Sequence, residues 1–169
     1  KAVCVNSVRT VLCRGMGSNP HIYWRKIFWK EILKVKYRVE TATKKNTKEF
    51  DKPNEDYFLV DRNNGIFIIL DGVTRDKIDG IYPDPSPACE VSKIFIDKAY
   101  NYIMNVSSKE SNYLKIIKNA FVEGNKEIEK FNHSYLGSFL PGTVGIIAII
   151  KDNKLFYGYI GDCIGILLN

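Results

Sequence analysis

The chain lacks several features that would place it in a specialised class of protein. No apolar run approaches the ~20 residues that a membrane-spanning helix needs, and polar residues interrupt the N-terminal KAVCVNSVRTVLCRGMG too often for a secretory signal. The four cysteines are widely spaced and form no Cys-x-x-Cys pair, which argues against a zinc site and a disulfide framework. These absences predict a cytoplasmic protein with reduced thiols and no membrane partner.

The remaining composition is that of one globular domain. The 169 residues are 45% hydrophobic and 26% charged, which suits a chain with a real core. The net charge of +6 permits binding to nucleic acid without establishing it. Much of the basic excess falls in HIYWRKIFWKEILKVKYR, where either a phosphate-binding patch or an amphipathic helix is possible. The helix is the favoured reading and nucleic acid is unlikely, because apolar residues recur at helical spacing: Trp24, Ile27, Phe28, Ile32 and Val35.

Patterns of hydrophobicity and turn residues predict a mixture of helices and antiparallel strands. In chain order, the predicted elements are an arm with a possible short helix over 1–33, a strand over 34–42, a hairpin turning at 61–65, helices over 87–105 and 109–131, and a second hairpin turning at 152–153. Ser86 is suited to cap the first long helix. Two apolar helix faces that pack on hairpin strands indicate the α+β class.

The first hairpin places acidic side chains at strand ends. If its turn centres on Asn63, Glu55 faces Asp71, and a register shifted by one residue places Asp56 opposite Asp71 instead. Like charges at directly opposed positions, roughly 5 Å apart, destabilise a sheet. A hard divalent cation such as Mg²⁺ or Mn²⁺ between the carboxylates would remove this repulsion. The alternative is that both strands end in solvent and the acids are simply hydrated.

The second hairpin brings one more acid to a strand end. A turn at 152–153 pairs Ile150 with Leu155 and sets Thr143 opposite Asp162. Asp162 follows a glycine, so it stands just beyond the apolar strand. The two hairpins together therefore supply four acids at the ends of strands.

Short motifs in a fixed order give the chain a resemblance to a known family. Asn-Glu-Asp at 54–56, Asp-Gly at 71–72, Gly-Thr at 142–143 and Gly-Asp at 161–162 surround the two predicted helices. Over roughly residues 35 to 169 this order resembles the first part of the metal-dependent protein serine/threonine phosphatases of type 2C, the PPM family. The segments DGVTRD and PDPSPA look more like the microbial branch.

The resemblance implies an α-β-β-α fold, in which helices flank a sandwich of two antiparallel sheets. It also implies two Mg²⁺ or Mn²⁺ ions at one end of the sandwich, with a third ion in some relatives. Asp71 would bridge two ions, Gly72 would offer its carbonyl oxygen, and Glu55 would bind directly or through water. Asp56 would orient metal-bound water, and Asp162 would help to bind a third ion.

The reaction that the resemblance implies is hydrolysis of phosphoserine and phosphothreonine in proteins by metal-activated water, without a covalent intermediate. Many relatives carry an Arg four residues before the Glu to grip the phosphate, whereas this chain has Asp51 there. Lys52 or Arg75 is expected to take that role, although Lys lacks the bidentate fork of Arg. Val73 replaces the His that animal members carry after Asp-Gly.

The family's catalytic domain continues past the Gly-Asp strand to further Asp ligands. The resemblance therefore makes residues 34–169 the N-terminal portion of such a domain, with an incomplete sandwich and little activity on its own. The alternative function is a non-catalytic, phosphatase-like interaction module. Uncovered sheet edges would also favour a partner protein or a second copy of the chain.

Overall fold

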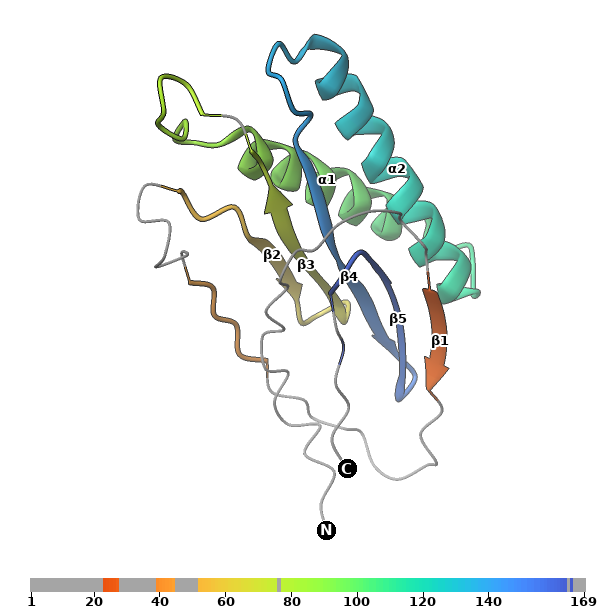
Figure 1. Cartoon of the computed structure of the whole chain (residues 1–169). Coiled ribbons are helices and arrows are strands. Elements are labelled where there is room, and N and C mark those ends of the chain that lie inside the picture. The colour runs from red at the N-terminus through yellow and green to blue at the C-terminus, as the bar shows by residue number, and fades with distance from the viewer. Residues whose placement is uncertain (1–22, 28–38, 45–51, 76, 164, 166–169) are drawn as a thin grey trace.

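The described part of the chain combines one antiparallel sheet with two long helices (Figure 1). The computed structural model describes residues 23–27, 39–44, 52–75, 77–163 and 165. Its elements are β1 Tyr23–Ile27, β2 Tyr57–Asp61, β3 Ile66–Val73, α1 Pro87–Val106, α2 Tyr113–Ser134, β4 Gly142–Lys151 and β5 Lys154–Ile160. This arrangement confirms the predicted α+β class.

The five strands lie in the order β1-β5-β4-β3-β2, and every neighbouring pair is antiparallel. In the first hairpin Tyr57 pairs with Leu70. Of the two predicted registers, this is the one that is shifted by one residue. One further step along that register places Asp56 opposite Asp71. In the second hairpin Ile150 pairs with Leu155, as the turn at 152–153 predicts.

Strand β1 corrects one expectation from the sequence. Tyr23–Ile27 form a strand rather than the start of an amphipathic helix, so the predicted helix is wrong over these residues. Aromatic and β-branched residues suit an extended edge strand, and this one pairs with β5 from Tyr23↔Tyr159 to Ile27↔Leu155. The rest of that predicted helix, and most of the predicted strand over 34–42, lie outside the described residues.

Side-chain caps define where both helices begin. Ser86 Oγ accepts a hydrogen bond from the backbone N–H of Cys89 at 3.2 Å, and Pro87 opens α1 as expected. The Asn112 side chain caps α2 by accepting a hydrogen bond from the backbone N–H of Lys115. This helix therefore begins at Tyr113, four residues later than its apolar pattern predicts. Within the described ranges, no helix is both long and apolar enough to cross a membrane.

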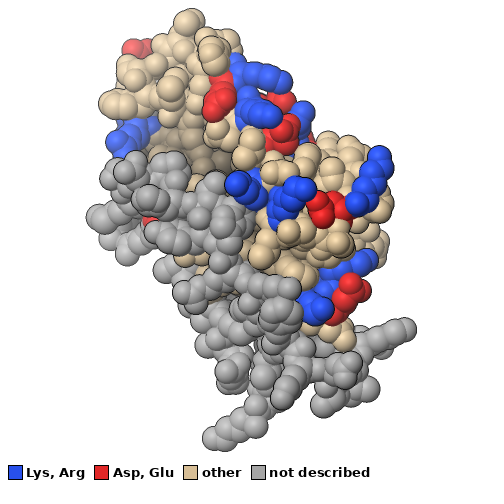
Figure 2. All heavy atoms as spheres, turned by 90° about the vertical axis from the view of Figure 1, so that its right-hand side faces the viewer, with Lys and Arg blue, Asp and Glu red and all other residues tan. Residues whose placement is uncertain are grey.

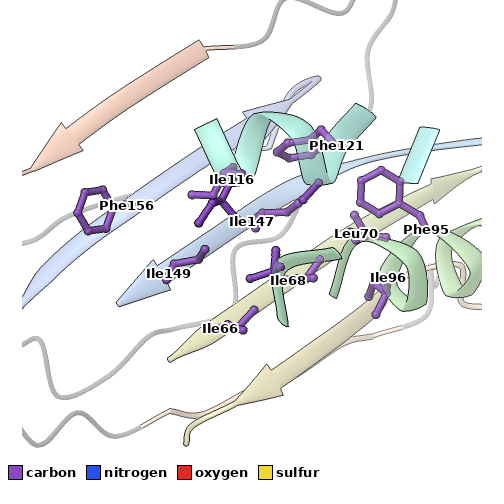
Figure 3. Close-up of a cluster of buried hydrophobic side chains, with 14 of the residues drawn as sticks. Ile66, Ile68, Leu70, Phe95, Ile96, Ile116, Phe121, Ile147, Ile149 and Phe156 are labelled. Carbon is purple, nitrogen blue, oxygen red and sulfur yellow. The ribbon is translucent and has the colours of Figure 1, made fainter. Parts of the chain in front are cut away.

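A hydrophobic core fills the space between the helices and one face of the sheet (Figure 3). The predicted faces of α1 and α2 are confirmed at Val91, Phe95 and Phe121, each at most 3% exposed. Gly124 lets the helices approach closely, since a Cβ there would lie 2.5 Å from the Phe95 ring. The core residues labelled in the figure are Ile66, Ile68, Leu70, Phe95, Ile96, Ile116, Phe121, Ile147, Ile149 and Phe156.

The sheet face away from the helices is apolar as well. Along β3, residues alternate between the faces, so Phe67 and Ile69 lie on the opposite side from Ile68 and Leu70. Phe67 is only 6% exposed. A sheet that is apolar on both faces suits the predicted sandwich. The described residues contain one sheet and one helical layer of that sandwich. A second sheet is not present among the described residues.

The cysteines do not all follow the expectation of reduced thiols. Cys163, which is 1% exposed, is disulfide-bonded, and the expectation is wrong for this residue. Cys89 is a free thiol of intermediate exposure. Cys4 and Cys13 lie outside the described residues. Spacing along the chain could not reveal a disulfide, because spatial proximity rather than sequence separation decides which thiols meet.

The position of β1 leads to a testable prediction. Deleting residues 1–27 removes the strand that hydrogen-bonds to β5 and leaves the N–H and C=O groups of that edge unpaired. We expect a lower melting temperature and more aggregation in thermal denaturation monitored with light scattering. Nucleic-acid binding that is steeply salt-dependent and disappears on the deletion would instead assign the segment to phosphate contacts.

Candidate functional site

Antiparallel pairing brings four chain segments together at one end of the sheet. The start of β2, the end of β3, the start of β4 and the end of β5 share this end, which is uppermost in Figure 1. Glu55 and Asp56 directly precede β2, Asp71 lies near the end of β3, and Asp162 follows β5. The acids predicted from the strand ends are therefore brought to the same end of the molecule.

Asp71 is the acid on which the others converge. Its neighbours Leu70 and Gly72 face the helices, so the half-buried Asp71 side chain lies on the opposite face of the sheet. Burial raises the pKa of Asp71 from 3.8 to about 7, with the negative charges of Asp56, Asp162 and Glu55 contributing in the same direction. Lys52 acts in the opposite direction. A carboxylate in this position is electrostatically favourable only when a cation is near.

Glu55 is the most deeply buried of the four acids. Its side chain is 4% exposed, and Lys52 Nζ lies 2.8 Å from Oε2. Despite this ion pair, neither carboxylate oxygen receives a hydrogen bond of acceptable geometry from the described residues. The hydroxyl of Thr74, a residue only 3% exposed, also finds no hydrogen-bond partner there. Because a buried carboxylate is costly unless it is paired and hydrogen-bonded, this end of the sheet favours added positive charge.

Asp56 is held by a small polar network. Thr43 Oγ1 donates to Asp56 Oδ2 at 2.8 Å, and Asn54 Nδ2 donates to the Thr43 oxygen at 2.9 Å. The Asn54 side-chain oxygen accepts from the backbone N–H of Asp56 at 3.2 Å. Sequence reasoning missed Thr43, and no local pattern could have found it, because this contact crosses from a separate segment of the chain.

Backbone contacts fix the neighbourhood of Asp71. A Cβ on Gly72 would lie 2.7 Å from the carbonyl oxygen of Glu55 and 3.0 Å from that of Ala88, so only glycine fits without a shift. Thr143 Oγ1 donates to the carbonyl oxygen of Asp71 at 3.0 Å, and Ser92 Oγ lies 3.2 Å from that hydroxyl. The Asp-Gly and Gly-Thr motifs thus hold the β3 and β4 ends together.

The two predicted phosphate-binding residues lie in different surroundings. Lys52 is at the acid cluster, and its ammonium also lies 5.8 Å from the centre of the Tyr82 ring. Lys77 approaches the same ring to 4.4 Å. Arg75 is exposed beyond β3 and makes no hydrogen bond or ion pair with other described residues. Tyr82 and Lys77 had no signal in the sequence, since aromatic and basic residues are common in loops.

The side chains fit a hydrated hard cation better than a closed metal cage. In the parts of the chain that the structure describes, no three His, Cys, Asp or Glu side chains form a group that could hold a metal ion. Mg²⁺, however, keeps several waters and commonly binds through only one or two carboxylates. The buried oxygens of Glu55 and the half-buried carboxyl of Asp71 match that mode of binding, with oxygen as the only donor atom.

No protein-family model matches the chain, and no curated protein matches it either. The chemistry of this site must therefore be inferred from its own residues. The carboxylates of Glu55 and Asp71, with the Lys52 ammonium beside them, are oxygen donors of the kind that a hydrated hard cation takes, and the ammonium is a group that attracts an anion such as phosphate.

Proposed function

We propose that the protein is a Mg²⁺- or Mn²⁺-dependent phosphatase of the type-2C kind that hydrolyses phosphoserine and phosphothreonine in proteins. The observation that carries the proposal is the convergence of Glu55, Asp56, Asp71 and Asp162 on one end of the sheet. A cluster of this charge, with a buried glutamate that lacks hydrogen bonds, needs a cation. The order of its motifs along the chain supports the same reaction.

Each residue has a stated role in this proposal. Glu55 and Asp71 hold the cation, with the Gly72 carbonyl oxygen and Asp162 as further oxygen donors. Asp56, which Thr43 fixes in place, accepts a hydrogen bond from water and orients it. A cation bound there lowers the pKa of water and neutralises charge on phosphate oxygens.

Lys52 is the better candidate for binding the substrate phosphate. Its ammonium is already at the acid cluster, whereas Arg75 extends into solvent beyond β3. A lysine binds phosphate as a point charge and, unlike the planar guanidinium of Arg, does not need to align two donors with two phosphate oxygens. Arg75 remains the second candidate, because its exposed side chain is available to a large protein substrate.

Asp56→Asn tests the proposed reaction. We expect the full-length protein, meaning a chain extended through the further Asp ligands that the resemblance implies, to hydrolyse a phosphothreonine peptide in Mn²⁺ and to lose this activity in EDTA. The variant should lower kcat by about 10- to 100-fold, because the amide orients water less well than the carboxylate. Phosphate release measured against Asp97→Asn, an exposed residue on α1, provides the comparison. Turnover that persists in EDTA would contradict the proposal.

A non-catalytic interaction module is the second candidate function. It is favoured by the absence, among the described residues, of three acids grouped closely enough to hold a metal ion. Such a module would bind phosphopeptide without releasing phosphate. Equilibrium binding of the peptide together with a lack of turnover in the full-length protein would distinguish it from the enzyme.

The face of the molecule that Figure 2 presents gives little support to nucleic-acid binding. Figure 2 shows Lys and Arg side chains beside Asp and Glu on the face that it presents, rather than gathered in one basic patch. On the helices, Lys126 pairs with Glu123 at 2.7 Å and Lys130 pairs with Glu127 at 2.9 Å. Basic side chains neutralised in this way contribute little to a phosphate-binding surface.

A further inference from the structure

Lys52 supplies positive charge to the acid cluster from within the chain. Its Nζ lies 2.8 Å from Glu55 Oε2, and the two side chains are 22% and 4% exposed. The same ammonium counteracts the effect of the surrounding acids on Asp71. An internal cation therefore neutralises part of the cluster.

Lys52 and a divalent cation would compete for the same carboxylate. Two positive charges that contact one buried carboxylate group repel each other, and the repulsion is strong where water is largely excluded. A glutamate that is 4% exposed leaves little room for solvent to screen this repulsion. Binding of a divalent ion to Glu55 therefore favours movement of the ammonium away from the carboxylate.

The Lys52 ammonium lies beside an aromatic ring while it pairs with Glu55. Its distance to the Tyr82 ring centre is 5.8 Å, within the range of a cation–π contact, so its flexible four-carbon stem can move toward the ring and away from the carboxylate. Lys77 lies over the same ring at 4.4 Å. Two ammonium groups around one aromatic ring, beside the acid cluster, form a place that suits a phosphate group.

We propose that Lys52 is an internal cation that neutralises Glu55 in the metal-free protein, and that a divalent ion displaces it and thereby frees it to bind phosphate. The inference rests on the proposed function, since it assumes that Glu55 belongs to the cation site. It makes metal and phosphate binding cooperative, because each bound ligand lowers the cost of binding the other.

Mn²⁺ titration of the 169-residue chain by electron paramagnetic resonance tests the displacement. Without phosphate, Lys52→Met should bind Mn²⁺ roughly 3- to 10-fold more tightly than the wild type, because the competing charge is gone. Lys52→Arg keeps the charge and should bind with nearly wild-type affinity. Lys130→Met, which removes an exposed ammonium on α2 that the proposed site does not use, serves as the control and should change Mn²⁺ affinity by less than twofold.

Inorganic phosphate tests the coupling. Phosphate should tighten Mn²⁺ binding by the wild type several-fold and should have little effect on Lys52→Met. Equal or weaker Mn²⁺ binding by Lys52→Met in the absence of phosphate would overturn the displacement while leaving the proposed function intact. Absence of Mn²⁺ binding by the wild type and all variants would overturn both.

Discussion

Asp71→Asn is expected to stabilise the metal-free protein and, at the same time, to remove its response to Mn²⁺. The pKa of Asp71 is raised from 3.8 to about 7, mainly by burial, so the folded chain holds this proton more tightly than the unfolded chain does. Its contribution to the free energy of unfolding therefore decreases as the pH rises from about 4 to 7, and it is least favourable above pH 7. The neutral amide avoids that cost.

The expected gain in the free energy of unfolding follows from the pKa shift of Asp71, reduced for screening by solvent. Each pKa unit corresponds to about 1.4 kcal/mol, but Asp71 is only half-buried, and screening reduces its effect to about 1 to 2 kcal/mol. In EDTA at pH 8, thermal denaturation followed by circular dichroism should show a melting temperature about 3 to 6 °C above the wild type. At pH 5 the difference should be much smaller, because the wild-type carboxyl is then protonated.

The response to added Mn²⁺ shows whether Asp71 belongs to a cation site or only repels the neighbouring acids. Mn²⁺ at about 100 times its dissociation constant should raise the free energy of unfolding of the wild type by about 2.7 kcal/mol. The same Mn²⁺ concentration should leave the free energy of unfolding of Asp71→Asn almost unchanged. In the full-length protein this substitution should also abolish hydrolysis. Asp97→Asn, on the exposed side of α1, should behave like the wild type. Equal Mn²⁺ shifts in Asp71→Asn and the wild type would remove Asp71 from the cation site.

The strands of the first hairpin could be predicted from sequence, but their register could not. Either register places an apolar residue of β2 opposite Ile68, Phe58 in one and Leu59 in the observed one, because apolar residues occupy consecutive positions along both strands. The turn decides between them through Asp61, whose carboxylate accepts hydrogen bonds from the N–H groups of Asn63 and Asn64 at 3.0 Å. Gly65 completes it with a φ of 69°. This geometry sets Asp56 opposite Asp71.

Strand β1 shows where local pattern fails. Tyr23–Ile27 contain aromatic and basic residues that fit a helical period as well as an extended one. What decides their structure is pairing with β5, which lies far along the chain. The strand or helix propensity of residues 23–27 carries no information about a partner so far along the chain. Strands β4 and β5, in contrast, are adjacent in sequence, and the turn at 152–153 between them reveals their pairing.

The acids of the candidate site were predictable because carboxylates at the ends of apolar strands conflict with the requirements of a sheet. The groups that surround them were not predictable in the same way. Nothing in the sequence pairs Ser92 with Thr143, yet their hydroxyl oxygens lie 3.2 Å apart. Tyr82 lies in a loop, and only the fold brings Lys52 to its ring.

Gly72→Ala is expected to damage the fold and the cation site together. The added methyl group would lie 2.7 Å from the backbone oxygen of Glu55 and 3.0 Å from that of Ala88. Backbone atoms cannot move aside as a flexible side chain can, so the overpacking should cost about 1 to 3 kcal/mol. Because the displaced segment is the one that carries Glu55, Mn²⁺ affinity should fall by about 10-fold or more.

Gly142→Ala is the matched control for this substitution. Gly142 pairs with Val73, immediately beside the Gly72↔Thr143 pair, and a Cβ there would meet no atom within 4 Å. Thermal denaturation and Mn²⁺ titration of this variant should therefore match the wild type. If Gly72→Ala loses stability but binds Mn²⁺ as tightly as Gly142→Ala, then Glu55 does not hold the cation, because its backbone cannot shift without moving its carboxylate.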